Sequence, residues 1–213
     1  MEEGRNPRDS AAAARIVQIT GRLMDREIMP WLARGGKPKK QEAVVAGAII
    51  GDRVCGSLAD PIIRNEQENR QLGSIGAFLK DRNYTLVQYN DIVDCMSMPP
   101  GTFACRLNIP AKVARRRRVV IPVDVVVMRK NAKPGDIPLF IECKSAGDFT
   151  NTNKRRKEEA VKVEQLKKTY GPDSGLLLFL CGYFDSGYLG YEAAEGIDWV
   201  WEHRIDDLEK AGV

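Results

Sequence analysis

The side chains best suited to chemistry are two carboxylates and an ammonium within apolar sequence. Asp124 closes an Ile-Pro-Val-Asp segment, and Glu142 and Lys144 follow after a turn in Leu-Phe-Ile-Glu-Cys-Lys. Successive side chains of a strand point to opposite faces, so we expect Glu142 and Lys144 on one face and Cys143 on the other. If the two segments pair as neighbouring strands, Asp124 lies beside Glu142.

Two carboxylates on a hydrophobic sheet are costly unless a cation compensates them. A divalent metal would satisfy both, because hard cations prefer oxygen ligands. Lys144 would then orient or deprotonate an attacking water. An acid-x-Lys triplet is also common by chance, so salt bridges at a strand edge are an equally good interpretation of these residues taken alone.

The sequence after Lys144 favours the metal site. Residues 145–153 lead into a run of four cations at 154–157, in the first turn of an expected helix. Cations there oppose the helix macrodipole, whereas an anion bound at the free N–H groups explains them. Asn and Arg also read purine edges. The candidate DNA contacts are Asn151, Asn153, Lys154, Arg155 and Arg156. A metal site followed by a phosphate site indicates a nuclease.

Charge is localised along the chain. The net charge is +4, yet residues 112–118 carry five cations and no acid. Such a patch is typical of a polyanion surface. Arg115, Arg116, Arg117 and Arg118 either follow a DNA backbone or form an exposed hairpin turn.

The remaining composition excludes several classes of protein. Five scattered cysteines without a Cys-x-x-Cys pair argue against disulfide scaffolds and structural zinc. His203 is the only histidine, so catalysis must depend mainly on carboxylates, lysines and a metal. We expect a cytoplasmic protein, because no signal peptide is visible and no apolar run approaches the ~18 residues of a membrane span.

The apolar pattern predicts helices followed by strands. We expect helices from Ser10 to about Gly35-Gly36, from Lys39 to Ile50, and from Ile62 to Arg82, the last starting at Asp60-Pro61 with an inner stripe of Leu72, Ile75 and Leu79. We expect strands at 84–89, 103–109, 119–128, 139–144 and 176–181, helices at 153–170 and 189–195, and a last strand holding Trp199 and Trp201. This order predicts an α/β fold, a mixed sheet covered by helices on both faces.

These segments resemble a known family. Pro122-Val-Asp124 with Glu142-Cys-Lys144 resembles the PD-(D/E)xK nuclease motif, with a valine inserted between the proline and the aspartate. Residues 60–72, 144–159 and 182–199 resemble type II restriction endonucleases, nearest the XamI-like group. The resemblance covers roughly Asp60 to Leu208, and we find no counterpart for the residues before Gly51.

The resemblance implies a three-layer α/β/α restriction-endonuclease-like fold. It implies a single nuclease domain over residues 1–213, with a helical extension at 1–58 and a catalytic core at 59–208. It further implies Mg²⁺-dependent, sequence-specific hydrolysis of double-stranded DNA that leaves 5′-phosphate ends. A homodimer and a cognate DNA methyltransferase are the implied partners.

The resemblance also implies roles for individual residues. Asp124 and Glu142 would be metal carboxylates, the Cys143 backbone carbonyl a further ligand, and Lys144 the catalytic lysine. Many members add a glutamate from an upstream helix. We expect Glu68, which shares the helix face of the inner stripe, with Glu66 as the second choice. A surface ion pair of Glu68 with Arg64 or Arg70 is the alternative.

Two other functions remain open at this stage. A repair or resolvase-type nuclease of the same fold would cut by DNA structure rather than sequence. A non-catalytic DNA-binding module would keep the fold and lose the chemistry.

Overall fold

The computed structural model describes residues 10–90, 94–114, 117–145 and 152–213. A few residues are described by their backbone alone: 10, 12, 113, 114, 117, 118 and 152–156. The chain divides into two compact units, residues 1–61 and 62–213. This division does not test the predicted boundary at residue 58, which stays a prediction.

The first unit is helical. It contains α1 (Ser10–Leu23), α2 (Trp31–Arg34) and the start of α3. The prediction of a single helix from Ser10 to Gly35-Gly36 is therefore wrong, because α1 ends at Leu23 and α2 begins only at Trp31. The Asp25 carboxylate accepts hydrogen bonds from the N–H groups of Glu27 (2.9 Å) and Ile28 (3.4 Å), which competes with helical pairing. Gly35 ends α2 in the left-handed conformation, with φ of 70°.

Helix α3 runs without a break from Lys40 to Asp81. The predicted helix boundary at Asp60-Pro61 is wrong, because Pro61 lies inside this helix. A proline removes one backbone hydrogen bond from a helix interior. The side chains of residues 60–66 are exposed, so water can reach the carbonyl that Pro61 leaves unpaired. The predicted inner stripe is confirmed, since Leu72, Ile75 and Leu79 are buried.

In the described residues of the second unit, six strands form one mixed sheet in the order β1-β2-β3-β4-β5-β6. The strands are β1 (Thr85–Leu86), β2 (Thr102–Ala114), β3 (Arg117–Met128), β4 (Leu139–Ser145), β5 (Leu176–Cys181) and β6 (Asp198–Trp201). Strands β2, β3 and β4 pair antiparallel, whereas β1 with β2, β4 with β5 and β5 with β6 pair parallel. The predicted strands are confirmed, with the first shortened to β1.

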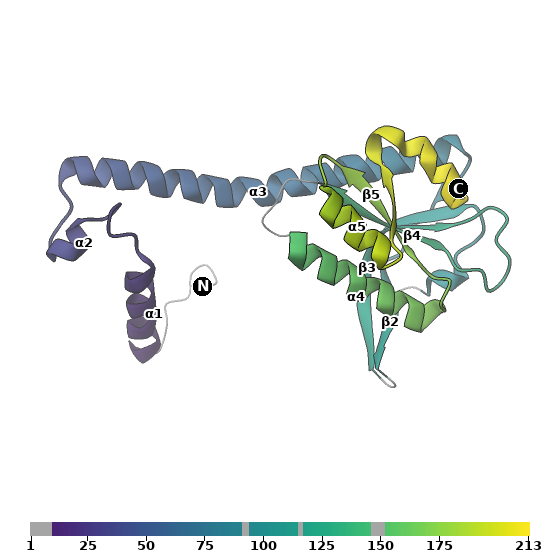
Figure 1. Cartoon of the computed structure of the whole chain (residues 1–213), viewed down its shortest axis with the longest axis horizontal. Coiled ribbons are helices and arrows are strands. Elements are labelled where there is room, and N and C mark those ends of the chain that lie inside the picture. The colour runs from purple at the N-terminus through teal and green to yellow at the C-terminus, as the bar shows by residue number, and fades with distance from the viewer. Residues whose placement is uncertain (1–9, 91–93, 115–116, 146–151) are drawn as a thin grey trace. The chain divides into compact units, whose positions relative to one another are not determined.

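Helices pack against this sheet through two separate cores. Helices α4 (Thr152–Tyr170) and α5 (Ser186–Ala194) lie next to each other across the strands (Figure 1). Strand β5 sends alternate side chains into the two cores, as strand geometry requires. Leu178 joins the core under α4 and α5, and Phe179 joins the core that holds α3 residues and Leu208 of η3 (Glu202–Ala211). The fold is α/β, with helices packed against a mixed sheet.

No described helix is both long enough and apolar enough to cross a membrane.

Two valines on α4 provide a test of this packing. Val163 is 4% exposed in the core under α4, whereas Val161 is 50% exposed on the same helix. We expect Val163→Ala to lower the free energy of unfolding by about 2 kcal/mol, because it removes two buried carbons and leaves a cavity. Val161→Ala should be neutral or slightly stabilising, since alanine is the better helix former. Urea denaturation of both variants checks this, and equal losses would contradict the packing of α4.

Candidate active site

Asp124 lies where the pairing of β3 with β4 stops. The described ladder pairs Val127 with Leu139 and ends with Val125 opposite Ile141. Beyond this point the Asp124 Oδ2 accepts a hydrogen bond of 2.8 Å from the Cys143 backbone N–H. Here a hydrogen bond to a side chain replaces the backbone pairing of the two strands. This bond holds Asp124 against β4, the strand that carries Glu142 and Lys144.

Glu142 and Lys144 share a face of β4, as the alternation predicts. The Lys144 Nζ lies 3.2 Å from the Glu142 Oε1. Ile141 and Cys143 instead belong to or pack against the core on the α3 side. The structure thus brings Asp124, Glu142 and Lys144 together at one point of the sheet.

The protonation of Asp124 depends on burial and on the charge of Glu142. Burial raises the pKa of Asp124 from 3.8 to about 6, and the negative charge of Glu142 adds to the rise. The hydrogen bond from the Cys143 N–H and the charge of Lys144 act in the opposite direction. Asp124 is therefore a carboxylate whose negative charge is only partly compensated.

Lys144 is surrounded by acids. Burial lowers the pKa of Lys144, but the charges of Glu142, Glu159 and Asp124 outweigh it and raise the pKa overall. The Glu159 Oε1 lies 3.5 Å from the Lys144 Nζ. In this state of the protein Lys144 is an ammonium at neutral pH.

Helix α4 supplies two site residues that the sequence analysis missed. Glu159 is 2% exposed, and its Oε2 accepts a hydrogen bond of 2.8 Å from the Tyr188 hydroxyl. Lys162 donates hydrogen bonds to the Glu142 Oε2 (2.7 Å) and to the Pro122 carbonyl (2.9 Å). Their spacing of three on the face that carries Val163 was the available signal, since residues three and four apart share a helix face.

Glu68 reaches the site from α3. It pairs with Arg106 at 2.9 Å, and neither Arg64 nor Arg70 is its described partner. Its negative charge contributes to the raised pKa of Asp124, so it lies near enough to act on that carboxylate. Glu66 is exposed on the same helix.

At Arg106 the side chains of strand β2 change the core into which they point. The Arg106 φ of 52° lies in the left-handed region, which is unusual for a residue with a Cβ. Cys105 packs with the core on the α3 side, whereas Leu107 belongs to the core under α4. Strand β3 makes the same change at Asp124. Val123 belongs to the core under α4, and Val125 belongs to the core on the α3 side.

The side chains of all nine candidate DNA contacts lie outside the described part of the structure. Arg115, Arg116 and Asn151 are outside the described residues altogether. Arg117 and Arg118 belong to β3 by their backbone, as Asn153, Lys154, Arg155 and Arg156 belong to α4. Their assignment to DNA stays a prediction.

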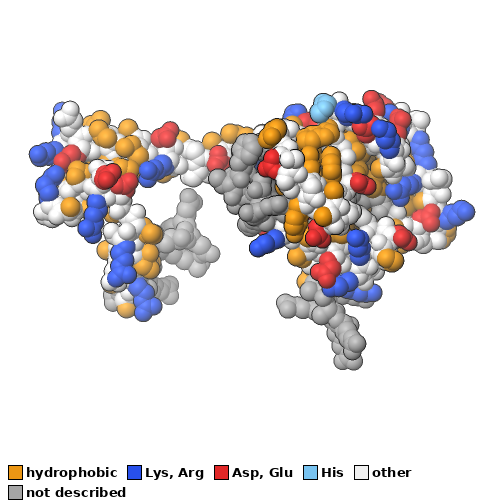
Figure 2. Space-filling view, viewed as in Figure 1, with side chains coloured by type: hydrophobic (Ala, Val, Ile, Leu, Met, Phe, Trp, Pro, Cys, Tyr) orange, Lys and Arg blue, Asp and Glu red, His pale blue; other side chains and the backbone are white. Residues whose placement is uncertain are grey.

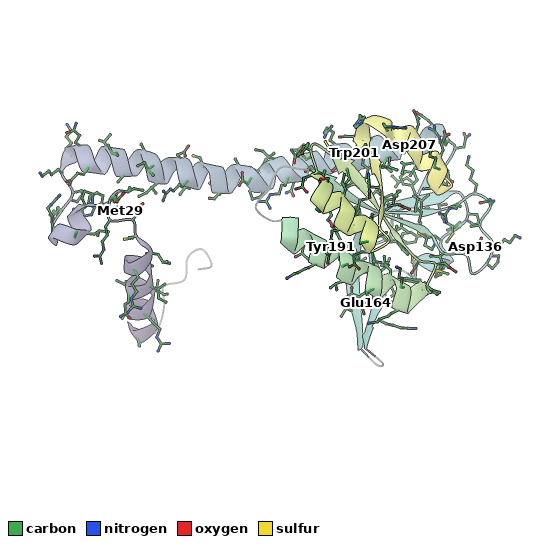
Figure 3. All side chains as sticks on the ribbon, in the orientation of Figure 1. Met29, Asp136, Glu164, Tyr191, Trp201 and Asp207 are labelled. Atoms are coloured by element: carbon green, nitrogen blue, oxygen red, sulfur yellow. The ribbon has the colours of Figure 1, made fainter. Side chains whose placement is uncertain are left out.

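The aromatic residues near the C-terminus have packing roles. Trp201, labelled in Figure 3, packs against the α4 core with its ring centre 6.1 Å from that of Phe184. Tyr188 is buried in the same core. Trp199 is likewise partly buried against this core. His203 is exposed.

The donor set fits a divalent cation by its chemistry. Asp124, Glu142 and Glu68 are hard oxygen donors. Burial and the charge of Glu142 raise the pKa of Asp124, so a positive charge beside these carboxylates would be favourable. Within the described residues no group of three or more His, Cys, Asp or Glu side chains is already arranged around one point. A cation would therefore have to share the Glu142 oxygens with the two lysines.

Comparison with known proteins identifies the family. The model of the XamI restriction endonuclease family matches residues 2–201. The type II restriction enzyme SalI of Streptomyces albus G is 48% identical over 199 residues, which are 93% of this chain and 62% of that enzyme. The chain belongs to the XamI restriction endonuclease family.

The matches also set limits and correct one expectation. The chain spans 62% of the length of SalI. The family match includes residues before Gly51, for which the sequence analysis had found no counterpart. Protein VC1899 from Vibrio cholerae, a solved structure, matches 66% of this chain and 30% of its own length at 15% identity, with a TM-score of 0.36. A likeness this slight does not define the fold.

The protonation of Asp124 predicts a pH-dependent effect of Asp124→Asn on the metal-free protein. A folded-state pKa of about 6 means that wild-type stability falls as pH rises from about 4 to 6. The asparagine keeps the acceptor for the Cys143 N–H and removes the charge. We expect the variant to be more stable at pH 7.5 by up to about 3 kcal/mol, at about 1.4 kcal/mol per pKa unit.

Urea denaturation in EDTA between pH 4.5 and 8 measures this difference. The advantage of the variant should shrink toward pH 4.5, where wild-type Asp124 is protonated. Asp198→Asn, an exposed residue at the start of β6, is the control and should show no such gain. A destabilised Asp124→Asn at pH 7.5 would contradict the electrostatics described for this carboxylate.

Proposed function

We propose that this protein is a type II restriction endonuclease that hydrolyses phosphodiester bonds of a specific double-stranded DNA site and leaves 5′-phosphate ends. The observation that carries the proposal is the meeting of Asp124, Glu142 and Lys144 at one point of the sheet, in a chain of the XamI family. SalI, by name a type II restriction enzyme, supports the same activity. The cores on both faces of the sheet support a three-layer α/β/α arrangement of residues 59–208.

Mg²⁺ is the proposed cofactor. Asp124, Glu142 and the Cys143 carbonyl would hold it, with Glu68 as the ligand from α3. Bound there, it would act as a Lewis acid toward the scissile phosphate and would lower the pKa of a coordinated water. The hydrogen bond from the Cys143 N–H to Asp124 orients this carboxylate toward β4.

Lys144 is proposed to act in the chemical step. Its ammonium lies between Glu142 and Glu159, so its position is fixed from two sides. As an ammonium it would stabilise negative charge on the phosphate, and as an amine it would accept the proton of the attacking water. The acids around it favour the first role until positive charge enters the site.

The basic segments would bind the DNA backbone and bases. These are Arg115 to Arg118, and Asn151, Asn153, Lys154, Arg155 and Arg156. Free N–H groups at the start of a helix bind phosphate. A cognate methyltransferase would protect the host DNA, and the cytoplasm is the compartment in which we place the enzyme.

A homodimer is the proposed assembly, since a palindromic site demands two-fold symmetry. The first unit supports pairing with a second copy. Ile50, Val54 and Leu58 follow one another at intervals of four on α3 and are exposed by 43, 49 and 65%. Figure 2 shows hydrophobic side chains at the surface of this unit. An apolar stripe of this kind is typical of an interaction surface.

Cleavage of phage DNA in the presence of Mg²⁺ tests the activity. We expect discrete fragments from the wild type and none from Glu142→Ala, because that change removes a metal ligand. Lys144→Ala should cut at least ~10²-fold more slowly in single turnover, the usual scale for a positioned proton-transfer group. Both variants should still bind the site in Ca²⁺. Glu164→Ala, on the outer face of α4 (Figure 3), is the control and should cut normally.

Other outcomes would replace the proposal. Cleavage of junctions alone, or an unresolved smear, would indicate a repair or resolvase-type nuclease. Retarded but intact DNA would indicate a binding module. Near wild-type cleavage by Glu142→Ala would remove the metal assignment.

The stripe on α3 predicts the effect of a charge on assembly. Leu58→Glu places a carboxylate in the proposed contact, at the most exposed residue of the stripe, where burial would be costly. We expect sedimentation equilibrium to give twice the chain mass for the wild type and a single chain for the variant. Val161→Glu, which is 50% exposed on α4, is the matched control and should remain dimeric. A dimeric Leu58→Glu would place the contact elsewhere.

A further inference from the structure

The ladder between β3 and β4 ends just before the residues that matter for chemistry. Val125 and Ile141 form its last described pair, so Asp124 and Glu142 follow on strands that no further backbone pair joins there. Both side chains carry negative charge, and the charge of Glu142 acts on Asp124. Repulsion between them would drive the two strand ends apart unless other bonds hold them.

Lys162 of α4 joins the two strands at this point. Its Nζ donates to the Glu142 Oε2 on β4 at 2.7 Å and to the Pro122 carbonyl on β3 at 2.9 Å. Pro122 is two residues from Asp124. The side chain of Lys162 is only 16% exposed, so water screens these bonds weakly. One ammonium therefore bridges the two strands that carry the acidic residues.

The other bonds of the site do not replace this bridge. Lys144 lies on β4 itself, so its contact with the Glu142 Oε1 joins two residues of one strand. The described side chains give Asp124 no ion pair of its own, and its bond to the Cys143 N–H is the second link between the strands. Lys162 is the described cation that links β3 to β4 here.

We propose that Lys162 is a positioning residue: it clamps the ends of β3 and β4 and thereby sets the separation of Asp124 and Glu142. The proposed function enters only in the purpose of this separation, which is to bind a divalent cation. The clamp itself is a property of the metal-free protein. It leaves the second lone pair of the Glu142 Oε2 and the whole of the Asp124 Oδ1 for such a cation.

Amide hydrogen exchange of the metal-free protein tests the clamp without any activity. The variants are Lys162→Met and Lys162→Arg. Methionine keeps the apolar part of the side chain as far as Cε and removes the N–H donors, whereas arginine keeps the charge. Lys168→Met is the control, because Lys168 pairs with Glu164 on the same helix and is 52% exposed. We expect the Cys143 amide to exchange at least ~10-fold faster in Lys162→Met, through local opening of the strand ends. The arginine variant and the control should resemble the wild type.

Calorimetric titration with Mn²⁺, without DNA, tests the consequence. Loss of a partner that orients a metal ligand typically weakens metal affinity ~10–100-fold, and we expect this for Lys162→Met and not for Lys168→Met. If Lys162→Met does not fold, Lys162→Gln, which keeps one N–H donor group and loses the charge, should show both effects in smaller measure.

Each of the other outcomes would overturn one part of this proposal. Unchanged exchange at Cys143 would remove the clamp, and acceleration that extends equally to Leu178 of β5 would make Lys162 a residue of general stability. Faster exchange with unchanged Mn²⁺ affinity would separate the clamp from the metal site. A wild type that binds no Mn²⁺ and cuts no DNA would refute the proposed function, while the exchange data would still decide the clamp.

Discussion

Repulsion between Asp124 and Glu142 is the constraint on which the arrangement of the site depends. The two carboxylates lie on neighbouring strands in surroundings that exclude enough water to raise the pKa of Asp124 to about 6. Backbone pairing of β3 with β4 does not extend to them. The strand ends are held by side chains instead: Asp124 accepts from the Cys143 N–H, and Glu142 receives Lys144 and Lys162 on its two oxygens. The stability of this region is therefore tied to charges that also suit a divalent cation.

The sheet accommodates this polar group by changing which face each strand buries. On β3 the side chains of Val123 and Val125 enter different cores, although they are two residues apart and would share a face in a regular strand. Strand β2 makes the same change at Arg106, whose left-handed φ of 52° breaks the regular extended conformation. Asp124 and Arg106 thus lie at the positions where the strands pass from one core to the other. A side chain at such a position lies between the two cores and belongs to neither.

The sequence predicted the parts of this site that depend on local periodicity. Alternation along β4 was enough to place Glu142 and Lys144 together, and helical spacing was enough to bring Glu68 toward the sheet. Helical spacing could place Lys162 on the inner face of α4, but not identify its partner, which is 20 residues distant along the chain. Arg106 could not be found in this way, because its partner is 38 residues distant and the pair depends on tertiary packing. The helix boundary predicted at Asp60-Pro61 was wrong for a related reason. Local propensity disfavours proline inside a helix, but the exposed surroundings of Pro61 and the buried residues that follow it outweigh that penalty.

The balance of charge connects the site to its proposed substrate. Among the described side chains, four acids (Glu68, Asp124, Glu142 and Glu159) meet three cations (Arg106, Lys144 and Lys162). With every group ionised this leaves one net negative charge, which explains why Lys144 keeps its proton. With a divalent cation bound as proposed, the balance would become one positive charge, which the single negative charge of a phosphodiester would neutralise. The positive excess would lower the affinity of Lys144 for its proton only until the phosphate binds. In the proposed complex, metal and phosphate would therefore act on the proton affinity of Lys144 in opposite directions, so the balance of both charges, rather than the metal alone, would set whether this residue meets the reacting water as an amine or as an ammonium.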